Sequence, residues 1–374
     1  MIRFALKTLL FDRGKLLIAV LGVVFSVVLV SIQGGLFLGL MSKASMLVDY
    51  SQADIWISRR GVENVDFSHV LPERWLSRLR AVPEVQEAQP LIVGKAMATT
   101  PDGGYEDVWV IGEAPESSIG FNWRYDAGQR RQAMGADAVT IDVHDRWKLG
   151  DLGIGDTFEL NGRRARIAAT TNGVLGFLVT PYLTTNINSA RAFCSIPDHQ
   201  CSYFLVKALP GQPIDELCRK LRDRLPEAEV MPAGTFGSRS RQYWMSRTGI
   251  GLSFGASTAL GLVVGLVMVA QSLYAITLDR LSDYATLKAM GAHDREIWLV
   301  LVTQALAIAL AGSIVGVAVT YAAVVLVATP VTPIITPLWL VIVGVLVNIG
   351  ICLASASLPA RRIHRVDAQT VLQG

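Results

Sequence analysis

Charge is missing from three long stretches of this sequence. Ile297–Ala360, a run of 64 residues, contains no Asp, Glu, Lys, Arg or His, and neither do Leu16–Ser42 and Thr248–Leu278. About 20 apolar residues in a helix cross the roughly 30 Å core of a bilayer. The two shorter runs therefore predict one span each. The longest predicts two, because three prolines within 329–337 cannot continue a helix.

The sequence also lacks the motifs of several function classes. The spans carry no charged residue, whereas secondary transporters and proton pumps usually place one on the ion pathway. No Gly-x-x-x-x-Gly-Lys-Ser/Thr loop is present to hold ATP. The catalytic patterns Gly-x-Ser-x-Gly and His-Glu-x-x-His are missing as well. We expect a non-catalytic subunit without a cofactor or metal, and we interpret residues 142–145 as a solvated loop.

Short basic flanks set the predicted orientation. Lys and Arg gather in 1–15, 279–296 and 359–374, whereas the turn at 329–337 has none. The positive-inside rule then places both termini and the 279–296 loop in the cytoplasm. The net charge of +3 is too small to indicate binding of nucleic acid.

The predicted architecture is a membrane protein with four transmembrane helices and a large α+β extracytoplasmic domain between helices 1 and 2. Helix 2 should project beyond the membrane as a stalk, because its 31 residues exceed one crossing. The predicted segments are an amphipathic cytoplasmic-surface helix (1–15), helix 1 (16–42), the extracytoplasmic domain (43–247), helix 2 with the stalk (248–278), a cytoplasmic loop (279–296), helix 3 (297–328), helix 4 (338–358) and a cytoplasmic tail (359–374).

Turn and periodicity signals predict mixed structure in the extracytoplasmic domain. Asn161-Gly162, between two runs typical of strands, is a strong hairpin signal. Apolar residues recur at helical spacing in 213–225. Residues near 113–200 indicate a β-rich subdomain inserted between two halves of the domain. Further strands are expected at 54–58, 107–112, 202–208 and 228–231, and a short helix at 72–82.

Three of the four cysteines lie in the predicted extracytoplasmic domain. Cys194 and Cys201 flank a loop-like stretch in an oxidising location, which leaves a disulfide or two free thiols as the alternatives. A zinc site that adds His199 lacks a fourth ligand. Cys218 is expected on a buried helix face.

Helix 2 carries glycines at the spacing that lets helices approach closely. Gly251 and Gly255 form one small-xxx-small pair, and Gly261 and Gly265 form another. We expect these glycines to pack against another helix, of this chain or of a second copy.

The 279–296 loop is the most specific segment of the sequence. Tyr284, Leu287 and Met290 can share one helical face, and Gly291 is placed to end that helix. Asp294 is placed to start helix 3. The length, the aromatic residue and the mixed charge favour a docking surface over a plain connector.

Residues 283–291, Asp-Tyr-Ala-Thr-Leu-Lys-Ala-Met-Gly, resemble the coupling-helix signature of the FtsX/MacB/LolC superfamily of ABC transporter permeases. Within it, the chain is most similar to the DevC-type exporters. Gln52–Ile55, the segment 243–251 at the entry of helix 2 and Pro359–Arg362 after helix 4 support the resemblance. It covers nearly the whole chain and is weakest in 113–200.

The resemblance implies partners and a mechanism. Such permeases act as dimers, most simply two copies of this chain, with ABC ATPase subunits that bind ATP and Mg. The coupling helix, here Tyr284, Leu287, Lys288, Met290 and Gly291, would receive the ATP-driven movement. Helix 2 would transmit it to the outer domain, which is called mechanotransmission. A HlyD-like periplasmic adaptor and a TolC-like outer-membrane channel would complete an export route.

Two other functions stay open at this point. One is a lipoprotein-releasing or peptidoglycan-hydrolase-regulating permease of the same superfamily, which a lipid-accepting groove between spans would favour. The other is a membrane-anchored sensor or a secondary transporter, which copurification of an ATPase would exclude.

Overall fold

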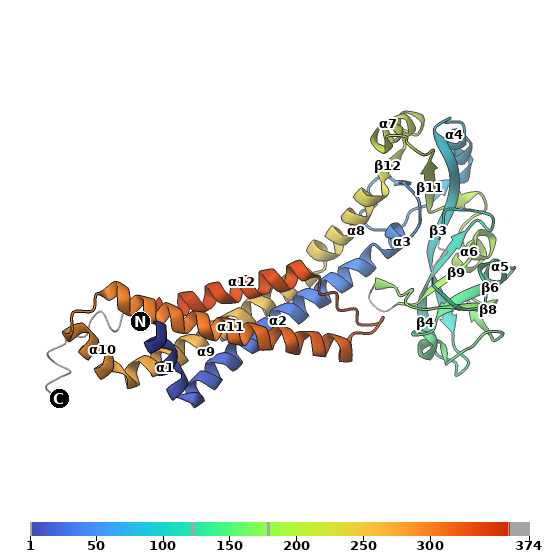
Figure 1. Cartoon of the computed structure of the whole chain (residues 1–374). Coiled ribbons are helices and arrows are strands. Elements are labelled where there is room, and N and C mark those ends of the chain that lie inside the picture. Colours follow the sequence, from blue (N-terminus) through green and yellow to red (C-terminus); the bar gives the residue numbers. More distant parts are fainter. Residues whose placement is uncertain (1, 121–123, 178–179, 358, 360–374) are drawn as a thin grey trace. The chain divides into compact units, whose positions relative to one another are not determined.

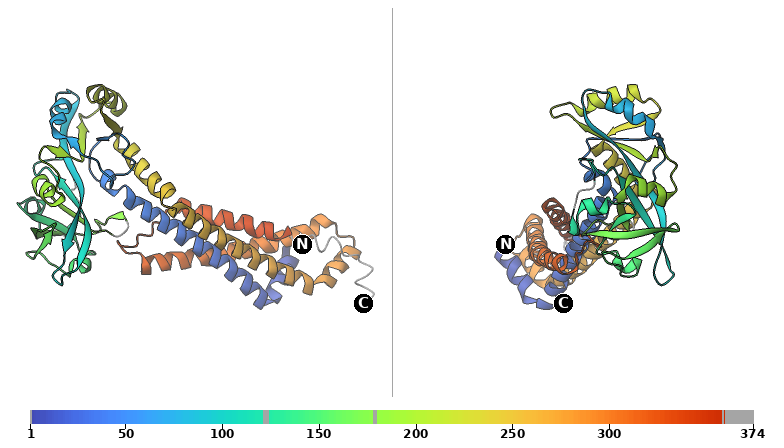
Figure 2. Two further views of the ribbon diagram at one scale, coloured as in Figure 1. Left: turned by 180° about the vertical axis from the view of Figure 1, so that it is seen from behind. Right: turned by 90° about the vertical axis from the view of Figure 1, so that its right-hand side faces the viewer.

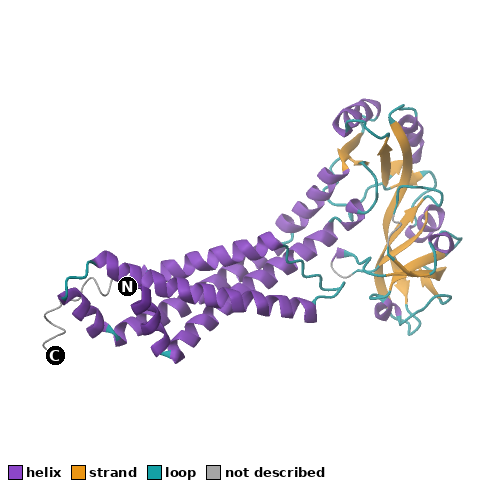
Figure 3. Cartoon of the chain, in the orientation of Figure 1, coloured by secondary structure: helices purple, strands orange, loops and turns teal. Residues whose placement is uncertain are grey.

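The computed structural model describes residues 2–120, 124–177, 180–357 and 359. Most of the predicted tail, including Ala360–Arg362, lies outside the described residues. The chain divides into two compact units, which we call the helical unit (1–39 and 251–374) and the sheet domain (40–250). Every described strand belongs to the sheet domain (Figure 3). The predicted fold class, membrane helices plus an α+β domain, is confirmed.

Long apolar helices make up the helical unit. Four of them, α2, α9, α11 and α12, are long and apolar enough to cross a membrane, and the four predicted spans overlap them. The helices of this unit are α1 (Ile2–Phe11), most of α2 (Arg13–Ala44), α9 (Ile250–Asp279), α10 (Leu281–Ala289), α11 (Asp294–Val327) and α12 (Leu338–Ser355).

The proline-rich turn between α11 and α12 packs on α2. The backbone N–H of Ile335 donates to the carbonyl of Gly35 at 3.0 Å. A Cβ on Gly39 would lie 1.8 Å from the carbonyl oxygen of Pro333, far inside van der Waals contact. Only glycine therefore fits at position 39. The Gly35 and Gly39 spacing in helix 1 could have indicated this close approach from the sequence.

Helices α2 and α9 run side by side within the helical unit (Figures 1 and 2). A Cβ on Gly261 would lie 2.4 Å from Leu29, and one on Gly265 would lie 2.7 Å from Ser26. This glycine pair packs against α2 of the same chain, as one alternative predicted. A Cβ on Gly255 would meet nothing within 4 Å, so the expected packing of that residue is not found within the described residues.

Twelve strands are described in the sheet domain, in two sheets. The larger has the order β12-β1-β11-β3-β4-β9-β6-β8-β5, with β7 pairing to β3 and β8, and the smaller joins β10 to β2. The strands are β1 (Ile55–Arg59), β2 (Leu71–Pro72), β3 (Val85–Thr99), β4 (Tyr105–Glu113), β5 (Tyr125–Ala127), β6 (Ala138–Asp142), β7 (Thr157–Leu160), β8 (Arg163–Thr171), β9 (Tyr182–Asn186), β10 (Gln200–Cys201), β11 (Tyr203–Ala208) and β12 (Ala228–Pro232).

The predicted β-rich insertion at 113–200 supplies β5–β9, and these strands belong to the same large sheet as the rest of the domain. Strand β9 pairs in parallel with β4, from Trp109 opposite Tyr182 to Glu113 opposite Asn186. This ladder joins β6, β8 and β5 to the same large sheet. The described residues of 40–250 form one compact unit. No local motif marks this join, because a parallel pair needs a long crossover and leaves no turn motif.

Other local predictions agree with the structure. The β7–β8 hairpin turns at Asn161 and Gly162, whose φ angles of 48° and 73° suit a tight two-residue turn. The periodic segment 213–225 forms α7, and it buries Leu217, Cys218 and Leu221. The domain's helices are α3 (Met46–Asp49), α4 (Leu76–Arg80), α5 (Arg130–Ala133), α6 (Ile187–Cys194), α7 (Ile214–Arg224) and α8 (Ala233–Arg247), with 3-10 turns η1 (Glu73–Trp75) and η2 (Arg146–Leu149).

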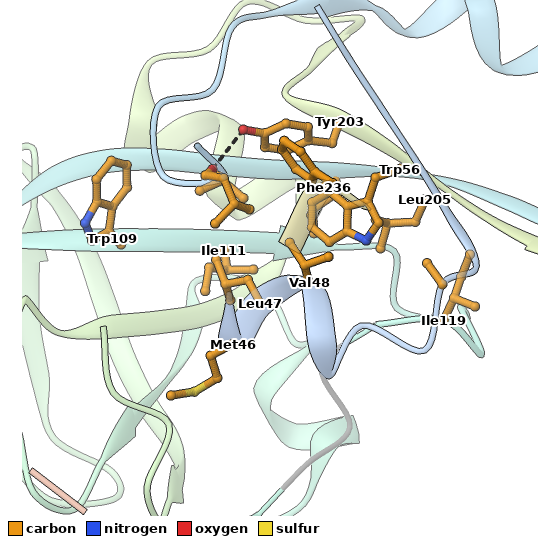
Figure 4. Packing of buried hydrophobic residues seen from close by; sticks show 14 of the residues in the cluster. Met46, Leu47, Val48, Trp56, Trp109, Ile111, Ile119, Tyr203, Leu205 and Phe236 are labelled. Carbon is orange, nitrogen blue, oxygen red and sulfur yellow. Dashed lines mark hydrogen bonds between the residues drawn. The ribbon is translucent and has the colours of Figure 1, made fainter. Parts of the chain in front are cut away.

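An aromatic core fixes α3 and α8 to the sheet. Trp56, Tyr203 and Phe236 pack with ring centroids 5.2–5.8 Å apart, and Leu47 and Val48 of α3 join the same cluster (Figure 4). The predicted helix 2 with its stalk (248–278) forms one continuous helix, α9 (Ile250–Asp279). Residue Gly249, with a φ of 74°, separates α8 from α9, because the left-handed conformation ends a helix.

Candidate functional site

Helix α10 ends as the sequence predicts. Gly291 has a φ of 95°, and its N–H donates to the carbonyl of Lys288, while the N–H of Ala292 donates to the carbonyl of Leu287, both at 3.0 Å. These two bonds form a Schellman motif, which satisfies carbonyls at a helix end. The next helix, α11, starts differently from the prediction. Its N-cap is His293, whose N–H donates to Glu296, so Asp294 is already inside the helix.

Tyr284 does not lie on an open docking face. Its side chain is only 1% exposed and packs edge-on against Phe4 of α1, with ring centroids 6.4 Å apart. Burial raises the pKa of Tyr284 to about 12. Tyr284 therefore packs within this chain, and its role in coupling to an ATPase stays a prediction. Periodicity identified the apolar face, but it could not show that α1 covers it.

The other predicted docking residues divide between two environments. Leu287 is half-buried against the same core as Tyr284. Met290 is 73% exposed, at the end of the helix next to Gly291. Ser282 and Thr286 are also exposed. The face that α10 offers to another molecule is therefore mostly polar, with Met290 as its large apolar side chain.

Charged side chains gather where α1, α2, α9 and α10 meet. The ammonium of Lys15 pairs with Asp279 and lies 3.2 Å from Asp12. The guanidinium of Arg280 lies 4.3 Å from the ring centroid of Phe11, which is cation–π distance. We call these five residues the clasp. The sequence contained a signal for it, since Lys15 and Asp279 flank two predicted spans on the same side.

A buried carboxylate occupies the sheet domain. Asp66 is 4% exposed and accepts a hydrogen bond of 2.9 Å from the hydroxyl of Tyr182. Burial raises the pKa of Asp66 to about 6, although Tyr182, Trp244 and Lys95 act in the opposite direction. The indole Nε1 of Trp244 is buried and has no partner in hydrogen-bonding geometry among the described residues. Sequence reasoning missed this group, since nothing around Asp66 marks it as buried.

Polar contacts tie α8 to two neighbouring segments. The hydroxyl of Ser240 accepts from the N–H of Val65 at 3.2 Å and donates to Asn64 at 3.0 Å. Arg241 bonds Ser45 at 2.6 Å and lies 3.3 Å from Asp49 of α3. Since α2 leads into α3 and α8 leads into α9, the two chain connections between the units are linked to each other within the sheet domain.

The interpretation of residues 142–145 as a solvated loop is wrong. Asp142 is fully buried and accepts hydrogen bonds from Val174 at 2.7 Å and from Thr171 at 3.1 Å. Asp145 is 2% exposed and pairs with Lys148 at 2.6 Å. Burial raises the pKa of Asp145. The described residues contain no cluster of His, Cys, Asp and Glu that could hold a metal.

The structure holds Cys194 and Cys201 as free thiols, which corrects the disulfide alternative. Cys201 is fully buried in the core beside α7, whereas Cys194 packs against the core between α6 and the sheet. Burial raises the pKa of Cys194 to about 12, so the thiol stays protonated. Cys218 is 1% exposed on α7, as predicted.

An apolar groove lies between α2, α9 and α11 in the helical unit. Its volume is about 690 Å³. Gln33 supplies the amide group among otherwise apolar side chains. The lining residues are Leu21, Val24, Phe25, Val28, Leu29, Ile32, Gln33, Val264, Met268 and Val319.

Family models match both units of the chain. The model for the MacB-like periplasmic core domain matches residues 16–224, and the model for the FtsX-like permease C-terminal region matches residues 255–368. Two relatives are uncharacterized ABC transporter permeases from two strains of Mycobacterium tuberculosis. Each is 26% identical over 321 residues, which cover 84% of this chain and 83% of the relative.

Solved structures of two bacterial protein domains are similar to part of this chain. The periplasmic region of MacB from Actinobacillus actinomycetemcomitans has a TM-score of 0.39 at 10% identity and covers 50% of this chain and 92% of its own. The extracellular domain of the noncanonic ABC-type transporter YknZ from Gram-positive bacteria has a TM-score of 0.36 at 14% identity and covers 48% and 98%. By the two family models, this chain belongs to the FtsX/MacB family of ABC transporter permeases, which places it in the inner membrane with an ATPase as its partner.

Proposed function

We propose that this chain is the non-catalytic permease subunit of an exporter that works by mechanotransmission. The observation that carries the proposal is a short capped helix, α10, between two long apolar helices, with its end at Met290 and Gly291 exposed. A partner ATPase, which binds ATP and Mg, docks at this end. The chain itself needs no cofactor for this role.

The direction of force follows from the order of elements. Arg280 joins the end of α9 to the start of α10. At its other end, α9 is joined to α8 through Gly249. Helix α8 is held to the sheet domain by Ser240 and by the aromatic core. A displacement of α10 therefore reaches the sheet domain through one covalent path. Both termini lie in the cytoplasm and the sheet domain lies outside, in agreement with the basic flanks.

The further partners follow from the resemblance to DevC-type exporters. Two copies of the chain form a homodimer, and a HlyD-like adaptor and a TolC-like channel continue the route to the outside. The exposed face of α9 around Gly255, where a Cβ would meet nothing, is available to the second copy.

The docking site is tested by one substitution and a matched control. Met290→Asp introduces a charge into the exposed end of α10 and should weaken ATPase association by roughly tenfold or more, because truncating or charging an interface anchor costs about 1–4 kcal/mol. Met97→Asp makes the same change on a strand of the sheet domain, where Met97 is 47% exposed. Copurification of the ATPase measures both. Equal association for the two variants and the unchanged chain would remove α10 from the docking site.

A second candidate function is supported by the apolar groove. A lipoprotein-releasing permease must accept acyl chains between its spans, and the groove beside Phe25 and Met268 has the chemistry for them. Photo-crosslinking from position 25 separates the candidates. Crosslinks to a lipoprotein would favour lipoprotein release, whereas crosslinks to a second copy of the chain would favour the exporter dimer.

A further inference from the structure

Helix α1 packs against Tyr284 of α10 and contacts α11 as well. Phe4 packs against Tyr284, and Ala5 and Leu9 are buried in the same core as Tyr284. The amide of Gln304 in α11 donates to the backbone carbonyl of Ala5 at 3.4 Å. An amphipathic helix lying only on the membrane surface would not bury these side chains against its own protein. Helix α1 is therefore part of the fold around α10.

The clasp adds an ionic link beside this packing. Lys15 stands in the first turn of α2, and Asp279 is the last residue of α9. Their ion pair joins the ends of two helices that pack along Gly261 and Gly265. Asp12, between α1 and α2, shares the same ammonium. One cation therefore connects α1, α2 and α9.

The next residue along the chain connects α10 to the same place. Arg280 lies over the ring of Phe11 and is 3.4 Å from Asp283 of α10. A cleft of about 460 Å³, lined in part by Thr8, Asp12 and Ile276, lies against this group. The clasp is thus compact and bordered by open space.

We propose that α1 is a brace for the coupling helix, and that the clasp passes a displacement of α10 to α2 as well as to α9. Lys15, Asp279, Arg280 and Phe11 are positioning residues in this scheme. This scheme rests on the proposed function, in which the ATPase displaces α10. It adds a second path, because α2 also runs without a break into the sheet domain, where Arg241 links α3 to α8.

The brace predicts a fixed distance between α1 and α10 that does not depend on the ATPase. Spin labels at Leu6 and Thr286, both exposed, report the distance between α1 and α10 in the full chain in lipid nanodiscs. Asp279→Lys should lengthen or broaden this distance, because two ammonium groups then face each other. Adding Lys15→Asp to it restores an opposite pair and should restore the distribution. Lys7→Asp reverses an exposed charge of the same basic flank and is the control.

The second readout is ATP hydrolysis by the assembled complex. Asp279→Lys should lower the stimulated rate by about tenfold with the ATPase still bound, and the double variant should recover most of it, as expected for a contacting pair. Asp279→Asn, a milder change that preserves insertion, should give a smaller loss in the same direction.

The outcomes separate the two proposals. If the wild-type chain binds no ATPase, the proposed function is wrong. The spin-label distances still test whether α1 acts as a brace. Unchanged distances in Asp279→Lys, or a double variant no better than the singles, would overturn the brace. A changed distance with an unchanged stimulated rate would also overturn it, because the clasp would then carry no displacement.

Discussion

The two units of this protein differ in how several of their buried polar groups are bonded. In the sheet domain, Asp66 and Asp142 are buried carboxylates that bond side chains or backbone from distant elements. In the helical unit, Thr277, Thr320 and Asn348 donate to the carbonyl four residues earlier in their own helix. A domain folded from water can arrange partners across its core. In lipid there is no water to bond a polar side chain, and a bond within the same helix needs no neighbouring element.

The difference indicates which interactions specify the structure of each unit. The sheet domain is specified by particular polar pairs, so losing one partner leaves the other buried. The helical unit is specified by shape, mainly by glycines that let segments approach closely. Substitutions that remove charge should therefore lower stability most in the sheet domain. Substitutions that add volume should lower it most in the helical unit.

The largest effect is expected for the buried ion pair of the sheet domain. Arg130 bonds Glu113 at 3.0 Å, and the Glu113 side chain is 2% exposed. Arg130→Met should lower the free energy of unfolding by about 4 kcal/mol, because it removes the cation from a buried carboxylate. The exposed neighbour Arg131, changed in the same way, should have almost no effect. Thermal unfolding of both variants in detergent measures the contrast, and equal stability of the two would contradict the comparison.

Added volume in the helical unit should come next. Gly39→Ala places a Cβ against the carbonyl of Pro333, and backbone cannot rotate away as a side chain can. We expect a loss of about 3 kcal/mol, typical of an overpacked site. Gly255→Ala is the matched control, because the new methyl meets nothing within 4 Å. If both alanines are tolerated equally, shape does not specify this unit as argued.

A pH-dependent effect of intermediate size is expected at Asp66. Its pKa is raised to about 6 in the folded protein, so the neutral acid is favoured there. The stability it contributes is fully present below the unfolded pKa of about 4 and is lost as pH rises through about 6. Asp66→Asn keeps an acceptor for Tyr182 without the charge. It should raise the free energy of unfolding by about 2 kcal/mol at pH 8 and by almost nothing at pH 4.

The pH series also provides the check on that prediction. Unfolding is followed at both pH values for the unchanged chain and for Asp66→Asn. Equal differences at pH 4 and pH 8 would show that the carboxylate does not titrate between them in the folded state. The gain would then come from some other property of the amide.

The smallest effect is expected when a buried serine is replaced by alanine, once in each unit. Ser202 in the sheet domain accepts from the N–H of Val93 and donates to its carbonyl, both at 3.0 Å. Ser26 in α2 is fully buried, and its hydroxyl has no partner among the described residues. Ser202→Ala should cost about 1 kcal/mol, whereas Ser26→Ala should be neutral or stabilising. A larger loss at Ser26 would reverse the comparison.

Much of the architecture was predictable because it depends on short-range patterns. The spans follow from runs without charge, the β7–β8 turn from Asn161-Gly162, and the end of α10 from Gly291. Each of these needs only a few neighbouring residues. Family resemblance rested on the same kind of local pattern, the signature at 283–291.

What sequence reasoning missed depends on contacts between distant segments. The burial of Tyr284 requires α1, and the burial of Asp142 requires Val174 and Thr171. The join of β9 to β4 involves a parallel pair without a turn signal. The free thiols of Cys194 and Cys201 follow from their places in different cores. A linear pattern holds no information on which distant element covers a given face.

The position of β1 in the large sheet has a consequence for how the protein is made. Strand β1 follows α2 almost immediately, yet it pairs with β11 and β12, near the end of the sheet domain's sequence. Contacts between such distant segments form slowly. The edges of β1 therefore stay open while the ribosome completes the rest of the domain and the translocation machinery moves it across the membrane. Until β12 arrives, the newly exported chain presents an unpaired strand to chaperones and proteases, and its biogenesis depends on how long that exposure lasts.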